Sequence, residues 1–118
     1  MRVQEIADAD DPYRRIHHSQ VKEGRPTRAA FTDPELSVDL ARLTTPEQRL
    51  TGHASHGLAS ITAGHARSLG QDVFHDPLET NPAQAIVKGK KTARIGKSLA
   101  RSATWVLLPP NNPAVIPA

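Results

Sequence analysis

The chain has 118 residues, which is enough for one domain with one hydrophobic core. It contains no cysteine, and this excludes a disulfide scaffold, thiolate zinc sites and thiol catalysis. Its net charge of +3 hides an asymmetry: residues 1–79 hold nine basic and twelve acidic residues, whereas residues 80–118 hold six basic residues and no acidic one. The C-terminal third is therefore the cationic part, and a surface of one sign attracts partners of the other.

The N-terminus and the hydropathy of the chain indicate a cytoplasmic protein that does not contact a membrane. The first residues, MRVQEIADADDPY, have no apolar run of the length that a secretory signal needs. No window approaches the roughly eighteen apolar residues of a membrane span. Because only Tyr13, Phe31, Phe74 and Trp105 are aromatic, the core must be aliphatic, and we expect a protein partner or a homodimer to add stability.

The first elements along the chain are weakly specified. Residues 1–12 are acidic and end in the turn signal Asp11-Pro12, which predicts a poorly ordered lead-in before a single domain over residues 13–108. Residues 13–21, YRRIHHSQV, lack clean alternation, so helix and strand both stay open there. The following KEGRPTR has the glycine and proline of an exposed loop.

Residues 33–43 carry two competing patterns. Leu36, Val38 and Leu40 alternate as in a strand, whereas Leu36, Leu40 and Leu43 recur at helical spacing behind the Asp-Pro start signal at residues 33–34. We favour the helix. A second start signal follows, in which Thr45 and Gln48 have the spacing of a capping box around a proline.

The middle of the chain predicts one long helix and a hairpin. Over residues 57–70, GLASITAGHARSLG has apolar residues at helical spacing, and Gly70 is well placed to end the helix. Residues 71–77 (QDVFHDP) and 81–87 (NPAQAIV) read as two short strands joined by a turn, so we expect them to pair.

Residues 88–101, KGKKTARIGKSLAR, pose the choice between a phosphate-binding loop and a basic helix. The loop motif needs a glycine five positions before the GKS at residues 96–98, but that position is Lys91. A helix capped by Thr92, with Ile95 and Leu99 facing the core, fits better, although a glycine inside a helix costs about 1 kcal/mol relative to alanine. We therefore predict a basic helix.

The C-terminal end completes the predicted fold. TWVLL over residues 104–108 is rich in strand-forming residues, and residues 109–118 form a proline-rich tail that we expect to be extended. The sum is an α+β protein: a single small domain with about three helices on a small, mostly antiparallel sheet.

The basic helix supplies the predicted binding face. Lys90, Arg94, Lys97 and Arg101 fall on one stripe if the helix extends back to Lys90. With so few aromatic residues, contacts to a nucleic-acid backbone are expected instead of base stacking. The predicted nucleic-acid-binding residues are Lys88, Lys90, Lys91, Arg94, Lys97 and Arg101.

Six histidines raise the question of a metal or a catalytic base. The pair in GHASHG (residues 52–57) is three apart but lies among glycines, and HExxH is absent, so we expect no metal and no cofactor. An arginine pair beside histidines suits a phosphate or nucleotide substrate. The catalytic candidates, if the protein is an enzyme, are Arg14, Arg15, His17, His18 and His75.

Three functions follow from these patterns. The first is a small binding protein that engages a polyanion, nucleic acid above all, or an acidic partner protein through its basic C-terminal face. The second is a small enzyme that acts on a phosphorylated or nucleotide substrate. The third is a non-catalytic partner subunit of the antitoxin or immunity type. The arrangement of the arginines and histidines in space distinguishes them, because an enzyme must bring these residues into one site.

Overall fold

An antiparallel sheet of six strands forms the centre of the molecule, and the computed structural model describes residues 3–110. The strands are β1 (Tyr13–His17), β4 (Glu35–Asp39), β5 (His56–Ser60), β6 (Asp72–His75), β7 (Gln84–Lys88) and β8 (Thr104–Leu107). They lie in the order β6-β7-β4-β1-β5-β8, and neighbours are antiparallel throughout. A separate hairpin consists of β2 (Val21–Lys22) and β3 (Arg25–Pro26).

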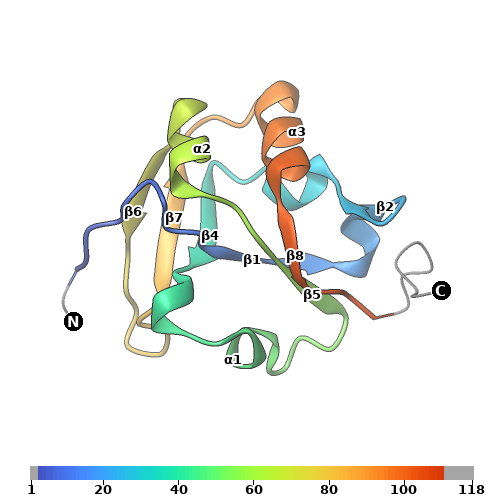
Figure 1. Cartoon of the computed structure of the whole chain (residues 1–118), viewed down its shortest axis with the longest axis horizontal. Helices are drawn as coiled ribbons and strands as arrows, with labels where there is room; N and C mark the ends of the chain where they lie inside the picture. Colours follow the sequence, from blue (N-terminus) through green and yellow to red (C-terminus); the bar gives the residue numbers. More distant parts are fainter. Residues whose placement is uncertain (1–2, 111–118) are drawn as a thin grey trace.

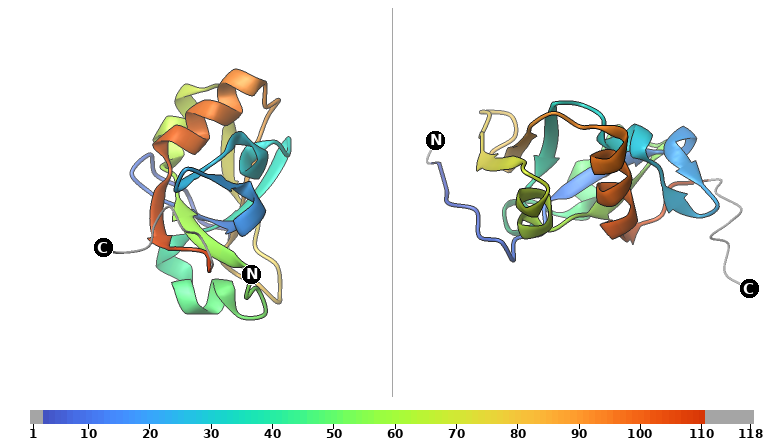
Figure 2. Two further views of the ribbon diagram at one scale, coloured as in Figure 1. Left: turned by 90° about the vertical axis from the view of Figure 1, so that its right-hand side faces the viewer. Right: turned by 90° about the horizontal axis from the view of Figure 1, so that it is seen from above.

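Helices lie on both sides of this sheet. The α-helices are α1 (Pro46–Leu50), α2 (Ala63–Ser68) and α3 (Ala93–Ser102), and the 3-10 turns are η1 (His18–Gln20), η2 (Arg28–Phe31) and η3 (Ala41–Leu43). Figure 1 shows α2 and α3 together at one side and α1 at the other, and the turned view in Figure 2 keeps this separation. The chain is thus a small α+β domain, as the sequence predicted.

The core lies between the sheet and the layer formed by α2, α3 and η2. Alternation along the strands directs Ile16, Leu36, Val38 and Val87 to this face, and each is at most 1% exposed. From the helix side, Leu99 is fully buried in the same cluster. The core is aliphatic, apart from Phe31 and a partly buried Trp105.

Two predicted helix starts are confirmed by their caps. The Thr92 hydroxyl accepts the N–H of Ile95 at 3.3 Å, and the Thr45 hydroxyl accepts the N–H of Gln48 at 3.2 Å. The predicted hairpin of β6 and β7 and the last strand are also present. These elements depend on local signals, which a short stretch of sequence contains.

The predicted helix over residues 33–43 is wrong, because β4 occupies its centre. Leu36 pairs with Val87 and Val38 with Ala85, so long-range pairing with β7 selects the alternating pattern. Both apolar side chains are buried, whereas Glu35 and Ser37 are exposed. The helical spacing of the leucines was a coincidence of two overlapping periods.

The helix predicted over residues 57–70 is wrong in its first half. Residues 56–60 form β5, and α2 begins only after Thr62, whose hydroxyl accepts the N–H of His65 at 3.2 Å. Gly57 is required in the strand, because a Cβ there would lie 2.5 Å from the backbone nitrogen of Pro109. Gly70 does follow the helix, with a φ of +81° that favours glycine.

The described part of the lead-in packs on the domain. Ile6 is 5% exposed and belongs to the core cluster, and the Asp8 carboxylate pairs with Arg67 at 2.7 Å. At the other end, the predicted extended tail lies outside the described residues from residue 111 onward. Among the helices of residues 3–110, none combines the length and apolar character needed to cross a bilayer.

The sheet opens between β1 and β4. The register joins these strands at one pair only, Tyr13 with Asp39, whereas β1 pairs with β5 along its whole length. Figure 1 shows β1 running across the end of β4 instead of alongside it. The C-terminal half of β1 therefore has no ladder on that side.

Candidate functional site

A cleft lined by basic side chains lies between α3, the β2–β3 hairpin and η2. Its volume is about 460 Å³. The lining residues are Lys22, Arg25, Pro26, Thr27, Arg28, Lys97, Ala100 and Arg101. Five of these are basic and none is acidic. We call this site the basic cleft.

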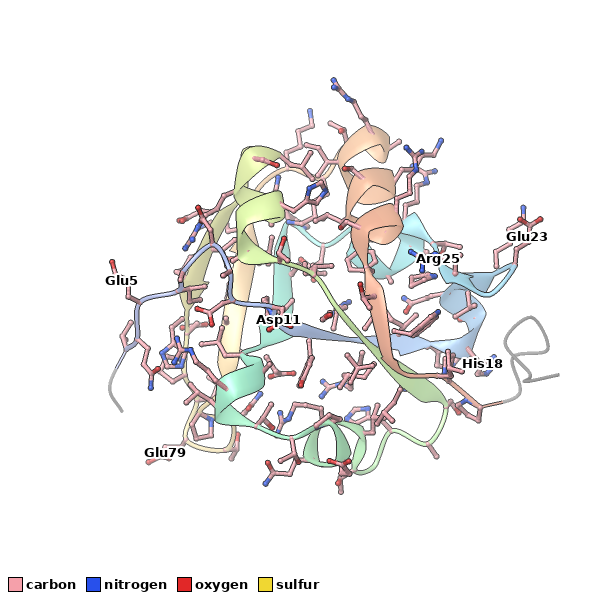
Figure 3. All side chains as sticks on the ribbon, in the orientation of Figure 1. Glu5, Asp11, His18, Glu23, Arg25 and Glu79 are labelled. Atoms are coloured by element: carbon pink, nitrogen blue, oxygen red, sulfur yellow. The ribbon has the colours of Figure 1, made fainter. Side chains whose placement is uncertain are left out.

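The hairpin that forms one wall is made by a two-residue turn. Glu23 and Gly24 have φ values of +53° and +77°, as in the turns that match strand twist, and Lys22 pairs directly with Arg25 across it. Figure 3 shows Glu23 at the tip, pointing away from the molecule, and Arg25 beside α3. The indole N–H of Trp105 donates to the Gly24 carbonyl at 2.9 Å and fixes the hairpin to β8.

Arg25 joins the hairpin to the end of α3. Its Nη2 donates to the carbonyl oxygens of Arg101 at 3.0 Å and Ala103 at 2.9 Å. These carbonyls form the negative end of the helix dipole, so the guanidinium offsets a charge that would otherwise repel an anion. Arg25 is therefore mainly a structural residue of the cleft.

Gly96, the glycine inside α3, lies where the helix packs against η2. A Cβ at Gly96 would lie 3.3 Å from the Cβ of Arg28, which is tighter than ordinary van der Waals contact. The missing side chain lets η2 approach the helix and brings Arg28 beside Lys97. Residues 96–98 are helical, with the Ser98 hydroxyl 3.0 Å from Nε2 of His65, so GKS is not a phosphate-binding loop.

The structure divides the six predicted nucleic-acid-binding residues. Lys97 and Arg101 line the basic cleft, and Arg94 borders another hollow of about 410 Å³ with Ser68. The predicted stripe does not reach Lys90, because α3 begins at Ala93 behind the Thr92 cap.

Lys88 and Lys91 lie apart from the cleft. Lys88 is the last residue of β7 and pairs with Glu35 and Asp72 on its two neighbours. The Nζ of Lys91 donates to the carbonyls of Val87 at 2.8 Å and Gly89 at 3.0 Å. Burial lowers the pKa of Lys91, and Asp33 partly offsets this, so Lys91 fixes a loop.

His75 does not join the other catalytic candidates. It lies on β6, with β7 and β4 between it and β1, and is 5% exposed. Its Nδ1 accepts the N–H of Gln4 at 2.8 Å, and its Nε2 donates to the Pro82 carbonyl at 2.7 Å. Both ring nitrogens are used, which marks a structural histidine.

Of the remaining candidates, Arg15 and His17 share one face of β1 and His18 follows the strand, whereas Arg14 leaves β1 on the opposite face. The ring of His17 lies 4.2 Å from that of His18 and 5.0 Å from that of His56, which in turn lies 5.3 Å from His53. Arg15 is on the same strand face as His17, and its Nη1 donates to the Arg49 carbonyl at 3.3 Å.

We call a subset of these residues the arginine–histidine cluster. It consists of Arg14, Arg15, His17, His53 and His56. Arg14 leaves β1 on the face opposite Arg15 and His17, and its guanidinium lies in the opening between β1 and β4. Sequence reasoning missed His53 and His56 as members, because only the pairing of β5 with β1 brings GHASHG beside YRRIH.

Positive charge dominates the electrostatics of the cluster. Burial lowers the pKa of His56, and the neighbouring His17, His53, Arg15 and Arg14 lower it further. The pKa of Arg14 is lowered by burial and then by Arg15, while Asp33 and Asp39 act in the opposite direction. Within residues 3–110, no three histidine or acidic side chains have the arrangement of a metal site.

No family model, no curated protein and no solved structure matches this chain. Function must therefore be inferred from the side chains and their surroundings.

Proposed function

We propose that the protein binds a polyanion, the phosphate backbone of a nucleic acid, through the basic cleft. The observation that supports this is the convergence of cations from the hairpin, η2 and α3 on one cavity without any acidic lining residue. Surfaces that serve only solubility usually intersperse both signs, whereas a phosphate-binding surface excludes acids.

The number of free cations in the cleft sets the number of phosphates that it can contact. Arg25 is committed to the carbonyls at the end of α3, which leaves Lys22, Arg28, Lys97 and Arg101. None of these four forms an ion pair in the part of the chain that the structure describes. About four phosphates can therefore be neutralised.

The binding should be largely independent of sequence. Stacking platforms need exposed aromatic rings, but no residue that lines the cleft is aromatic, and the indole N–H of the nearby Trp105 is engaged with Gly24. Contacts from flexible lysine and arginine side chains to phosphate oxygens position a nucleic acid without reading its bases.

The test is a salt titration of the affinity for a short labelled DNA duplex, followed by fluorescence anisotropy. Each neutralised phosphate contributes about 0.9 to the negative slope of log affinity against log salt, so four contacts give about −3.6. The triple variant Arg28→Gln/Lys97→Gln/Arg101→Gln should leave a slope of about −0.9.

A matched control removes the same charge elsewhere. Lys88→Gln/Lys90→Gln/Arg94→Gln takes three charges from the predicted basic segment but none from the cleft. It should leave the slope near the wild-type value. Equal losses in both variants would contradict the cleft as the binding site, as would a wild-type protein that binds acidic polypeptides but no duplex.

A further inference from the structure

The arginine–histidine cluster contains two adjacent arginines that lack a counter-ion. Neither Arg14 nor Arg15 has a carboxylate oxygen within 4.0 Å in residues 3–110, although both side chains are partly buried. Charges removed from water are normally paired, because an unpaired charge loses its hydration without compensation. Something anionic from outside the chain would supply the missing charge.

Arg14 is held in a fixed orientation at the opening of the sheet. Its Nε donates to the Ala30 carbonyl and its Nη1 to the Ser37 carbonyl, each at 3.0 Å. The guanidinium thus bridges β1 and β4 where their ladder is missing. Its Nη2 makes no hydrogen bond within the described residues, so one edge of a preorganised fork remains available.

Further polar atoms around Arg15 are also unmatched, and Nδ1 of His56 becomes a donor when the ring is protonated. The Nδ1 of His56 and the Nε of Arg49 are buried atoms with no hydrogen-bond partner in the described chain. Nδ1 of His17 accepts the Ser19 N–H at 3.1 Å, which places the proton of the neutral ring on Nε2 and makes that nitrogen a donor. These polar groups come from β1, β5 and α1.

The nearby acids are already engaged. Asp39 accepts the Asn81 amide at 2.7 Å and lies 3.5 Å from Nη1 of Arg49. Asp33 accepts the N–H of Glu35 at 2.8 Å. The two carboxylates therefore reduce the positive potential of the cluster without satisfying its arginines.

From these contacts we propose that the arginine–histidine cluster binds the phosphate group of a small phosphorylated ligand, at a site separate from the basic cleft. A tetrahedral dianion matches several donors that approach from three elements, and arginine forks bind phosphate oxygens in pairs. The partly buried position of Arg14 within the sheet favours a terminal phosphate over the continuous backbone of a duplex.

Binding at this site is coupled to histidine protonation. A bound dianion opposes the charges that lower the pKa of His56 and so raises it, which means that the dianion binds more tightly as the pH falls through the histidine range. The charged and titratable groups that act on His56 or lie in the adjoining layer are Arg14, Arg15, Arg49, Asp39, His17 and His53.

Calorimetry with inorganic phosphate, adenosine monophosphate and adenosine tests the proposal. Phosphate and the monophosphate should bind saturably with one site per chain, and adenosine should not bind. Arg15→Gln should weaken both by about tenfold or more, as expected for a charge-assisted contact, and Arg15→Lys by less. The cleft variant Arg28→Gln/Lys97→Gln/Arg101→Gln should bind both as the wild type does, which separates this site from the proposed nucleic-acid interface.

A second measurement keeps the test decisive if the Arg15 variants fail to fold. In the wild-type protein, saturating sulfate, which stays dianionic between about pH 5.5 and about pH 8, should raise the pKa of His56 followed by NMR of its ring. No saturable phosphate binding, an unchanged His56 pKa, or loss of binding in the cleft variant instead of Arg15→Gln would each overturn the proposal.

Discussion

The basic cleft and the arginine–histidine cluster are both cationic, but they are built in opposite ways. The cleft consists of side chains from the β2–β3 hairpin, η2 and α3, and of its five basic side chains only Arg25 makes a hydrogen bond within the described residues. The cluster is built around β1, a central strand of the sheet. There the Arg14 guanidinium donates to the carbonyls of Ala30 and Ser37, where the β1–β4 ladder is missing. Charge at a surface can be removed without structural consequence, whereas charge inside a sheet is part of the structure.

The largest loss of stability is expected from truncating Leu99, a core residue of the helix that forms one wall of the cleft. Leu99 is fully buried on the inner side of α3, which forms the cleft on its outer side. Leu99→Ala should lower the free energy of unfolding by about 2–5 kcal/mol, through lost burial and the cavity left behind. Urea denaturation measures this. An unchanged midpoint would mean that α3 contributes little to the core.

A smaller loss is expected from Arg14→Met. The methionine roughly preserves the volume but leaves the carbonyls of Ala30 and Ser37 without their donor. An unsatisfied buried group costs about 1–3 kcal/mol, but only the Ala30 bond is partly buried, and water can replace the donor at the exposed Ser37 carbonyl. The variant should therefore lose about 1 kcal/mol. Arg101→Gln, which removes a charge from the cleft, should change stability by less than about 0.5 kcal/mol. Equal losses of stability from the two substitutions would contradict the view that the cluster arginine is part of the fold and the cleft arginine is not.

Local signals in the sequence predicted part of this arrangement. The threonine caps of α1 and α3 were readable because a cap depends on residues three apart. The strands β4 and β5 were not, since Leu36 and Leu58 fit helical and strand periods equally well, and only pairing with β7 and β1 decides between them. Strand pairing is long-range information that one segment does not carry.

The two sites show the same limit. Lys97 and Arg101 were predicted as binding residues, but Arg25 and Arg28 were read as part of an exposed loop. The sequence did contain one signal for the hairpin wall of the cleft, namely the two-residue turn Glu23-Gly24, across which Lys22 pairs with Arg25. His75 matched the chemistry of a catalytic base, yet its nitrogens serve the backbone, which residue type alone does not reveal.

The pH dependence of stability distinguishes the two regions further. Because burial and neighbouring cations lower the pKa of His56 in the folded state, the unfolded chain binds its proton more readily. Stability should therefore be complete above the unfolded histidine pKa of about 6.5 and fall as the pH drops below it. Thermal unfolding at a series of pH values should show a weaker acid dependence for His56→Gln than for the wild type. The cleft variant, which keeps this histidine, should retain the wild-type dependence, and a reversed order would contradict the role of the cluster.

The smallest effect is expected from Lys97, the lysine of the GKS sequence. In a phosphate-binding loop this residue would be indispensable, but here it is exposed on the outer side of a helix and is one of four free cations in the basic cleft. Lys97→Gln should leave the melting temperature almost unchanged, since exposed substitutions usually alter stability by less than about 0.5 kcal/mol. It should flatten the slope of log affinity against log salt by about 0.9, with duplex binding retained at low salt. If Lys97→Gln instead abolished all binding, one lysine would dominate the cleft, and its charges could not act as a sum of independent phosphate contacts.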